Sequence, residues 1–176
     1  NIISSFTSPK CLKYNLKLNS FVQTDYKIIT KQEKLTEVAY VSFTYKTCSY
    51  FNNDIYLLNL IKHMFASGMS SRLFSNLREK HGLTYTSDAN CNYFEHSGDF
   101  SITCESNYNK LFGKNNIFDI LIQILNEFIS NGVTTDEIDK ILGYMNGQNK
   151  ISLNDNKHIC EYNAVNLLCN NLTHSI

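Results

Sequence analysis

Three stretches of the chain alternate apolar and polar positions as β-strands do. The first, residues 38–45, reads VAYVSFTY and is rich in β-branched and aromatic side chains. Residues 83–93 and 99–105 follow the same alternation, and the Glu95-His96-Ser97-Gly98 segment between them has the composition of a hairpin turn. The pattern predicts an antiparallel pair at 83–105 and a central strand at 38–45. The apolar faces would carry Ala39, Val41, Phe43 and Tyr45 in the first strand and Phe100, Ile102 and Cys104 in the last.

Two helices are expected between the first and second strands. Apolar residues recur at helical spacing from Ile55 to Phe65, with Asn53 or Asp54 as the cap and Gly68 as the stop. A second, shorter helix would begin at Ser70 or Ser71 and carry Leu73, Phe74 and Leu77. It would end at Gly82, which can adopt the left-handed conformation that closes a helix.

The remainder of the chain has the pattern of three more helices. The apolar stripe from Ile117 to Ile129 ends at Gly132, and Thr134 with Glu137 forms a capping-box pattern for the next helix. That helix would place Ile138, Ile141, Leu142 and Met145 on one face. A last helix, at about 156–168, would bury Ala164, Val165 and Leu168.

Strands and helices that are each apolar on one face predict an α+β fold. We expect a two-layer sandwich in which helices pack on one face of a mixed or antiparallel sheet. The 176 residues suffice for one sizeable core, so we expect residues 1–176 to form a single domain. The chain opens at Asn1 instead of Met and ends at Ile176 soon after a helical pattern, so we also expect it to be a piece of a longer chain.

Charge and hydropathy argue against several classes of partner. Lys plus Arg and Asp plus Glu both number 16, so no net charge attracts a nucleic acid or an anionic membrane surface. The longest apolar stretches, such as Ile55–Ile61, are far shorter than the roughly 20 residues of a membrane span. The six cysteines form no Cys-x-x-Cys pair, and we expect free thiols in a reducing intracellular compartment.

Arg78 and Tyr85 are the residues whose chemistry could act on a peptide. Arg78 falls in the last turn of the second helix and Tyr85 early in the next strand, so both can reach the same corner of the sandwich. A guanidinium offers five donors and a phenol one, which could hold a peptide carbonyl or a developing oxyanion. On chemistry alone the plainer alternative is favoured, in which Arg78 complements the helix dipole and Tyr85 packs.

A resemblance changes this balance. The stretch from Gly68 to Tyr85, GMSSRLFSNLREKHGLTY, resembles the signature of the carboxyl-terminal repeat of insulinase/pitrilysin metallopeptidases, including mitochondrial processing peptidase relatives. The order of elements from about Tyr26 to about Leu168 is similar as well. The resemblance implies one half of a clamshell whose homologous other half carries zinc in an inverted H-x-x-E-H motif. It also implies that Arg78 and Tyr85, seven residues apart, contact the peptide substrate and help to stabilise the tetrahedral intermediate.

No zinc site is expected within this chain itself. Its histidines are isolated, and the nearest approach to the inverted motif, His158-Ile159-Cys160-Glu161-Tyr162, has a phenol where the second imidazole is needed. A solvated helix face with an i, i+3 pair of His158 and Glu161 is the favoured interpretation. Zinc is instead expected on the companion half.

The sequence therefore predicts the substrate-gripping half of a zinc metalloendopeptidase, inactive on its own. Its catalytic residues would be Arg78 and Tyr85. Its partners would be a peptide substrate and the zinc-bearing half, in the same chain or in a separate subunit. The alternative is a non-catalytic structural or peptide-binding relative of the same fold.

Overall fold

A computed structural model describes residues 27–29, 31 and 37–170 of the chain. The chain divides into two units, residues 1–32 and 33–176, and every helix and strand named below belongs to the second. The expectation that residues 1–176 form one domain stays a prediction.

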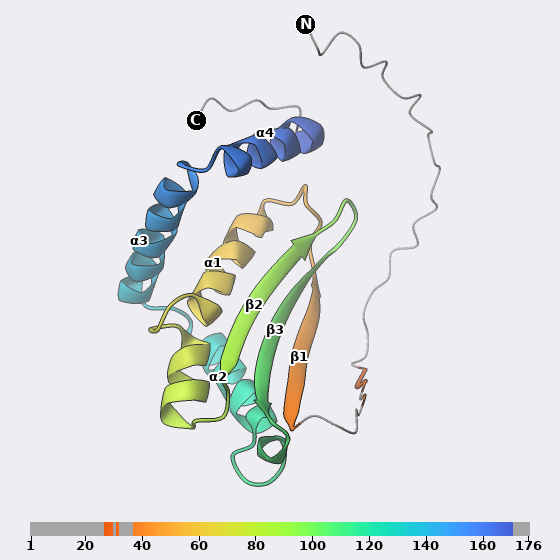
Figure 1. Ribbon diagram of the computed structural model, residues 1–176, viewed down its shortest axis with the longest axis vertical. Coiled ribbons are helices and arrows are strands. Elements are labelled where there is room, and N and C mark those ends of the chain that lie inside the picture. The colour runs from red at the N-terminus through yellow and green to blue at the C-terminus, as the bar shows by residue number, and fades with distance from the viewer. Residues whose placement is uncertain (1–26, 30, 32–36, 171–176) are drawn as a thin grey trace, which may run out of the picture. The chain divides into compact units, whose positions relative to one another are not determined.

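The described strands form an antiparallel sheet in the order β1-β3-β2 (Figure 1). They are β1 (Val38–Thr47), β2 (Thr86–Tyr93) and β3 (Gly98–Asn107), and β2 and β3 form the expected hairpin. Among the strands of the described residues β3 lies between the other two and β1 lies at an edge, which contradicts the expectation that the 38–45 strand is central. Richness in β-branched and aromatic residues reflects one buried face, and an edge strand can have that as well.

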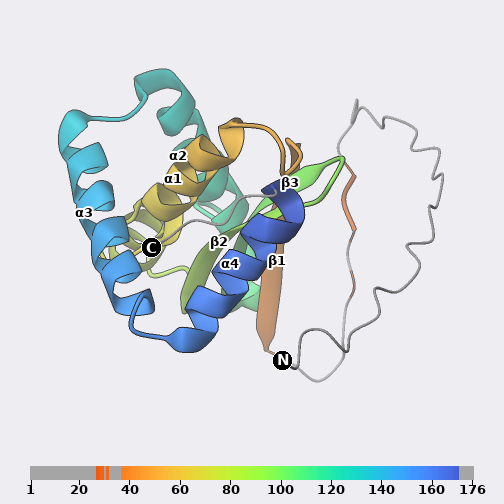
Figure 2. The same cartoon turned by 90° about the horizontal axis from the view of Figure 1, so that it is seen from above.

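The helices are α1 (Asp54–Ala66), η2 (Phe74–Lys80), η3 (Tyr108–Leu111), α2 (Ile117–Asn131), α3 (Thr135–Ser152) and α4 (Asn156–Asn170). Three helices, α1, η2 and α2, pack against one face of the sheet and form the core with it (Figures 1 and 2). On the opposite face Tyr40 is 78% exposed. This arrangement confirms the expected α+β sandwich. Its buried side chains include Val41, Phe65, Leu73, Leu77, Ala89, Phe100, Ile102, Cys104, Ile117, Ile120, Leu121 and Ile124.

Gly98 opens β3 at a point where three strands crowd together. A Cβ atom at this position would lie 2.3 Å from the backbone oxygen of Cys48 and 2.8 Å from that of Asn92. Both obstacles are backbone atoms, which cannot rotate away as a side chain can. Position 98 therefore requires glycine, which lets the neighbouring backbone segments approach closely.

Some expected caps and buried faces differ in the structure. The Asn53 side chain makes no capping bond for α1; the amide of Asp54 donates instead to Asn52 Oδ1 at 2.8 Å. In α2 the buried face does not extend to Ile129, the last residue of the expected apolar stripe, because Ile129 is 78% exposed. Gly132 ends that helix as expected, with a φ of 67°.

The last two helices are buried less than their patterns suggested. In α3 Ile141 is buried, but Leu142 is 45% exposed. The expectation that α4 buries Ala164 and Val165 was wrong, because both are exposed. The Leu168 side chain lies outside the described part of the chain. Apolar spacing identifies the face of a helix but not whether another element covers it.

Candidate functional site

The helical turn that carries Arg78 is built on Ser71. Ser71 is 2% exposed, and its hydroxyl and carbonyl oxygens accept bonds from the amides of Phe74 and Ser75 at 3.4 and 3.0 Å. Of the two candidate caps, Ser70 and Ser71, the structure thus uses Ser71. From Phe74 to Lys80 the helix widens to π geometry, which the sequence did not predict. Such wide turns are rare and occur often at functional sites.

Gly82 turns the chain out of η2 and into β2. Its φ of 57° is left-handed, as the sequence predicted. The Gly82 amide donates to the carbonyl oxygen of Arg78 at 3.1 Å, and the Leu83 amide donates to that of Leu77 at 2.7 Å. These two bonds fix the path between Arg78 and the strand, so the short connection holds the position of Tyr85 relative to Arg78.

Arg78 and Tyr85 line the same hollow, which has a volume of about 190 Å³. The hollow lies at the start of β2, and its walls come from the end of α1, from η2 and from the first residues of the strand. Its lining is formed by Ala66, Phe74, Arg78, Tyr85, Thr86 and Ser87. The structure thus brings the two residues together at one corner of the sandwich.

Both side chains are held yet remain accessible. The guanidinium carbon of Arg78 lies 5.2 Å from the centroid of the Phe74 ring, a distance at which a cation is attracted to an aromatic face. The Tyr85 side chain is 57% exposed, and its hydroxyl donates to Asn107 Oδ1 at 3.3 Å. The Tyr85 amide donates to the carbonyl oxygen of Glu105 at 3.0 Å, which fixes its backbone to β3.

Arg72 anchors the helix that carries Arg78, a role that the sequence analysis missed. Its guanidinium donates to both carboxylate oxygens of Glu137 at 2.7 and 2.8 Å and to the carbonyl oxygen of Gly132 at 2.9 Å. It also lies 5.0 Å from the centroid of the Phe128 ring. Of the expected capping box, only half forms: Thr134 Oγ1 accepts from the Glu137 amide at 3.3 Å, and the Glu137 side chain turns to Arg72.

The ion pair between Arg72 and Glu137 shifts the pKa values of both side chains. Its hydrogen bonds hold the pKa of the Glu137 carboxyl below the ordinary value, against the opposing effect of burial. The same bonds raise the pKa of Arg72. Glu137 stands 65 positions from Arg72 in the chain, and no local pattern links the two.

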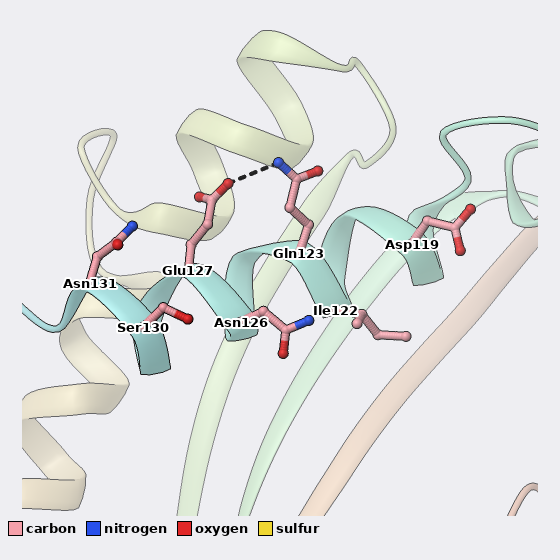
Figure 3. Close-up of a pocket in the computed structure, with 7 residues that line it drawn as sticks. All are labelled: Asp119, Ile122, Gln123, Asn126, Glu127, Ser130 and Asn131. Atoms are coloured by element: carbon pink, nitrogen blue, oxygen red, sulfur yellow. Dashed lines mark hydrogen bonds between the residues drawn. The ribbon is translucent and has the colours of Figure 1, made fainter.

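A second hollow, of about 410 Å³, runs along α2 (Figure 3). Its lining residues all belong to that one helix, and among them Gln123 Nε2 donates to Glu127 Oε1 at 2.8 Å. None of the residues predicted from the sequence to act on a substrate lies there. A wall from a single helix does not converge on a ligand, so this hollow is not the candidate site.

Residues 13–143 match the family model described as the peptidase M16 inactive domain, and this match covers more than half of the chain. The chain belongs to this family. The resemblance to insulinase-type metallopeptidases seen in the sequence is thereby confirmed.

Relatives of this M16 inactive domain are longer proteins. The "Uncharacterized zinc protease YmxG" of Bacillus subtilis (strain 168) is 26% identical over 137 residues, which are 78% of this chain and 33% of that protein. The crystal structure of a protease from Helicobacter pylori has the same fold, with a TM-score of 0.71 and 19% identity over 78% of this chain and 33% of that one. The peptidase M16 inactive domain from Pseudomonas fluorescens gives a TM-score of 0.59 and 20% identity over 64% of this chain and 27% of that one. This M16 domain thus spans about a third of the length of its Bacillus relative.

The described part of the M16 domain does not bring zinc ligands together. Between residues 37 and 167, no three His, Cys, Asp or Glu side chains lie close enough to hold a metal ion. His158 is exposed, and Glu161 lies 3.7 Å from Lys157, so the expected i, i+3 pair of His158 and Glu161 is replaced by an i, i+4 ion pair. The donor set of these residues does not fit zinc, and its expected place on a companion half stays a prediction.

The described cysteines, Cys48, Cys91, Cys104 and Cys160, are free thiols. Burial raises the pKa of the Cys104 thiol to about 12, so it packs as a small apolar group, as its strand position suggested. Cys11 and the Cys169 side chain lie outside the described residues. No helix of the described chain is both long and apolar enough to pass through a membrane.

Proposed function

We propose that this M16 inactive domain is the substrate-gripping half of a zinc metalloendopeptidase, in which Arg78 and Tyr85 contact the peptide opposite a zinc site on a companion half. The observation that carries the proposal is that these two side chains line one hollow and are both accessible from solvent. The family and the name of the Bacillus relative, a zinc protease, support it further.

The two side chains supply donors that are already oriented. With one face of its guanidinium against Phe74, Arg78 keeps N–H groups at its edge for an incoming oxygen. The bond from Tyr85 to Asn107 is long and exposed, so its hydroxyl can exchange that acceptor for a peptide carbonyl at little cost. Donors fixed before the peptide arrives stabilise developing negative charge without reorganisation during the reaction.

The companion half, the peptide substrate and the compartment belong to the same proposal. The chain covers 33% of the Bacillus protein that is called a zinc protease, which leaves room in a protein of that length for a second, zinc-bearing half. The balance of 16 basic and 16 acidic residues supports a peptide over a nucleic acid or a membrane surface as the partner. Free Cys48, Cys91 and Cys160 are compatible with a reducing intracellular compartment.

The test is turnover of a peptide by the chain combined with its companion half. Arg78→Ala and Tyr85→Phe should each lower kcat/KM by about 10-fold or more, as expected for lost charged or transition-state hydrogen bonds. Lys80→Ala removes a cation from the same helix, and Tyr56→Phe removes a hydroxyl from α1, where Tyr56 is 73% exposed. These two controls should leave turnover unchanged.

If Arg78→Ala and Tyr85→Phe match their controls, the catalytic roles of both residues are wrong. If the chain with its companion binds peptides but does not cleave them, the domain is the non-catalytic, peptide-binding relative that the sequence left as the alternative.

A further inference from the structure

The hollow beside Arg78 and Tyr85 has the size of one side chain. Its volume of about 190 Å³ is well below the roughly 300–1,000 Å³ of pockets that enclose drug-sized ligands. A peptide passing over it could therefore place a single residue inside. The size limits the ligand to one group, and the lining decides which group it is.

The lining is rich in hydrogen-bond donors and carries one positive charge. Arg78 supplies N–H groups and the charge, and the hydroxyls of Tyr85 and Ser87 can donate as well. Ser87 shares the face of β2 that carries the buried Ala89, whereas the Thr86 side chain lies on the opposite face. No acidic side chain lines the hollow. Within the described chain no carboxylate forms an ion pair with Arg78, whereas Arg72 in the same segment is fully engaged by Glu137.

The remaining walls are apolar. Ala66 and the ring of Phe74 also line the hollow, and they can pack against the methylene groups of an entering side chain. The nearest acids are held elsewhere or lie outside it: Glu79 is exposed on η2, and Glu105 stands opposite Thr86 in β3. Asp88 accepts a bond from the Ala89 amide at 2.8 Å and another from Asn90 Nδ2 at 3.1 Å.

A strand edge beside the hollow suits an extended peptide. In the described sheet β2 pairs only with β3, so every second peptide group of β2 faces away from its partner. The Ala89 amide of β2 donates to the Asp88 side chain. The first residues of β2, which line the hollow, have no side-chain hydrogen bond to their backbone amides among the described residues. A peptide meeting this end of the strand would pass directly over the hollow.

We infer that the hollow is a specificity subsite for an acidic side chain, Glu or Asp, of the peptide substrate. This inference rests on the proposed function for the peptide itself. It adds a residue preference that the proposed function does not require, since contacts to a peptide carbonyl are the same for every substrate residue. Arg78 has five N–H donors, so it can bind the carboxylate as well as the peptide oxygen of the proposed function, and Ser87 orients the carboxylate.

The experiment compares peptides with blocked termini that differ only in one residue, Glu, Gln or Lys, cleaved by the chain combined with its companion half. The Glu peptide should have a KM about 10-fold lower than its Gln isostere, and the Lys peptide should bind worst. Ser87→Ala keeps the approximate side-chain volume and removes the hydroxyl on the face of β2 that borders the hollow. This substitution should reduce the preference for the Glu peptide over the Gln peptide.

Failure of this inference can be told apart from failure of the proposed function. If Arg78→Gln lowers kcat equally for the Glu and Gln peptides, and KM does not differ between them, the catalytic role stands and the acidic subsite is refuted. If the assembly does not cleave peptides, fluorescence polarisation with labelled Glu and Gln peptides and the whole chain decides the subsite alone. Tighter binding of the Glu peptide that Arg78→Gln abolishes would support it, and equal affinities would overturn it.

Discussion

Breaking the Arg72–Glu137 pair should destabilise the domain, because this pair joins the segment that carries Arg78 to the start of α3. The two side chains are 19% and 25% exposed, and they share two bonds of 2.7 and 2.8 Å. A charged, bidentate pair shielded to this degree contributes about 1.5–3 kcal/mol, and the contact of Arg72 with Phe128 adds about 0.5–1 kcal/mol. Arg72→Ala should therefore lower the free energy of unfolding by about 2–4 kcal/mol.

The assay is urea unfolding of the whole chain with Arg72→Ala, Glu137→Gln and the double variant. A coupling energy of about 1.5 kcal/mol is expected from the cycle, because Arg72→Ala removes both shared bonds and Glu137→Gln removes the charge and one of the two acceptors. Lys140 and Asp136, an exposed i, i+4 pair at 2.6 Å on the same helix, form the matched control. That pair should couple much more weakly, since solvent screens it. Equal coupling in the two cycles would refute the reasoning that shielding and bidentate geometry make the Arg72 pair strong.

Two further predictions follow from the same contacts and from the glycines. Because Arg72 holds the pKa of Glu137 below its ordinary value, the pair should stabilise the fold fully above the unfolded-state pKa of about 4.3 and lose this effect as the pH falls through the lower folded-state value. The difference in unfolding free energy between the wild type and Glu137→Gln should thus be constant near neutral pH and shrink in acid; a difference that grows in acid would contradict it. Gly98→Ala should cost more than about 3 kcal/mol in thermal or urea unfolding, because a Cβ would meet backbone atoms at 2.3 and 2.8 Å. Gly143→Ala is its control: beyond its own helical backbone and chain neighbours no atom lies within 4 Å of a Cβ there, and the helix should gain about 0.5–1 kcal/mol. Similar effects of the two substitutions would show that crowding at Gly98 is not the cause.

Much of the fold was predictable from local patterns. The alternation of Phe100, Ile102 and Cys104 and the stop at Gly82 depend on neighbouring residues, and all appear as expected. The position of β1 at an edge of the described sheet could not be predicted, because it depends on which strands pair. A strand buried on one face has the same composition at the edge and in the centre of a sheet.

The candidate site was predictable only in part. Arg78 and Tyr85 are close in the chain, so a helix end and a strand start suffice to bring them to one corner. Their neighbours in the hollow are less local, since Ala66 arrives from the end of α1. The partner of Arg72 lies 65 positions away, and the sequence shows Glu137 only as a member of a capping-box pattern. The exposed faces of α3 and α4 were missed for a related reason, because amphipathic spacing does not show what covers a helix.

The central claim is that a peptide binds at the hollow and touches Arg78 and Tyr85. The most direct measurement is an NMR titration of the isotope-labelled chain with an uncleaved peptide, following backbone amides and the Arg78 side-chain Nε–H signal. We predict that the largest shifts occur at Arg78, Tyr85 and the other residues that line the hollow. Shifts confined to the exposed face of α2 or to the sheet face that carries Tyr40, with Arg78 and Tyr85 unmoved, would contradict the account.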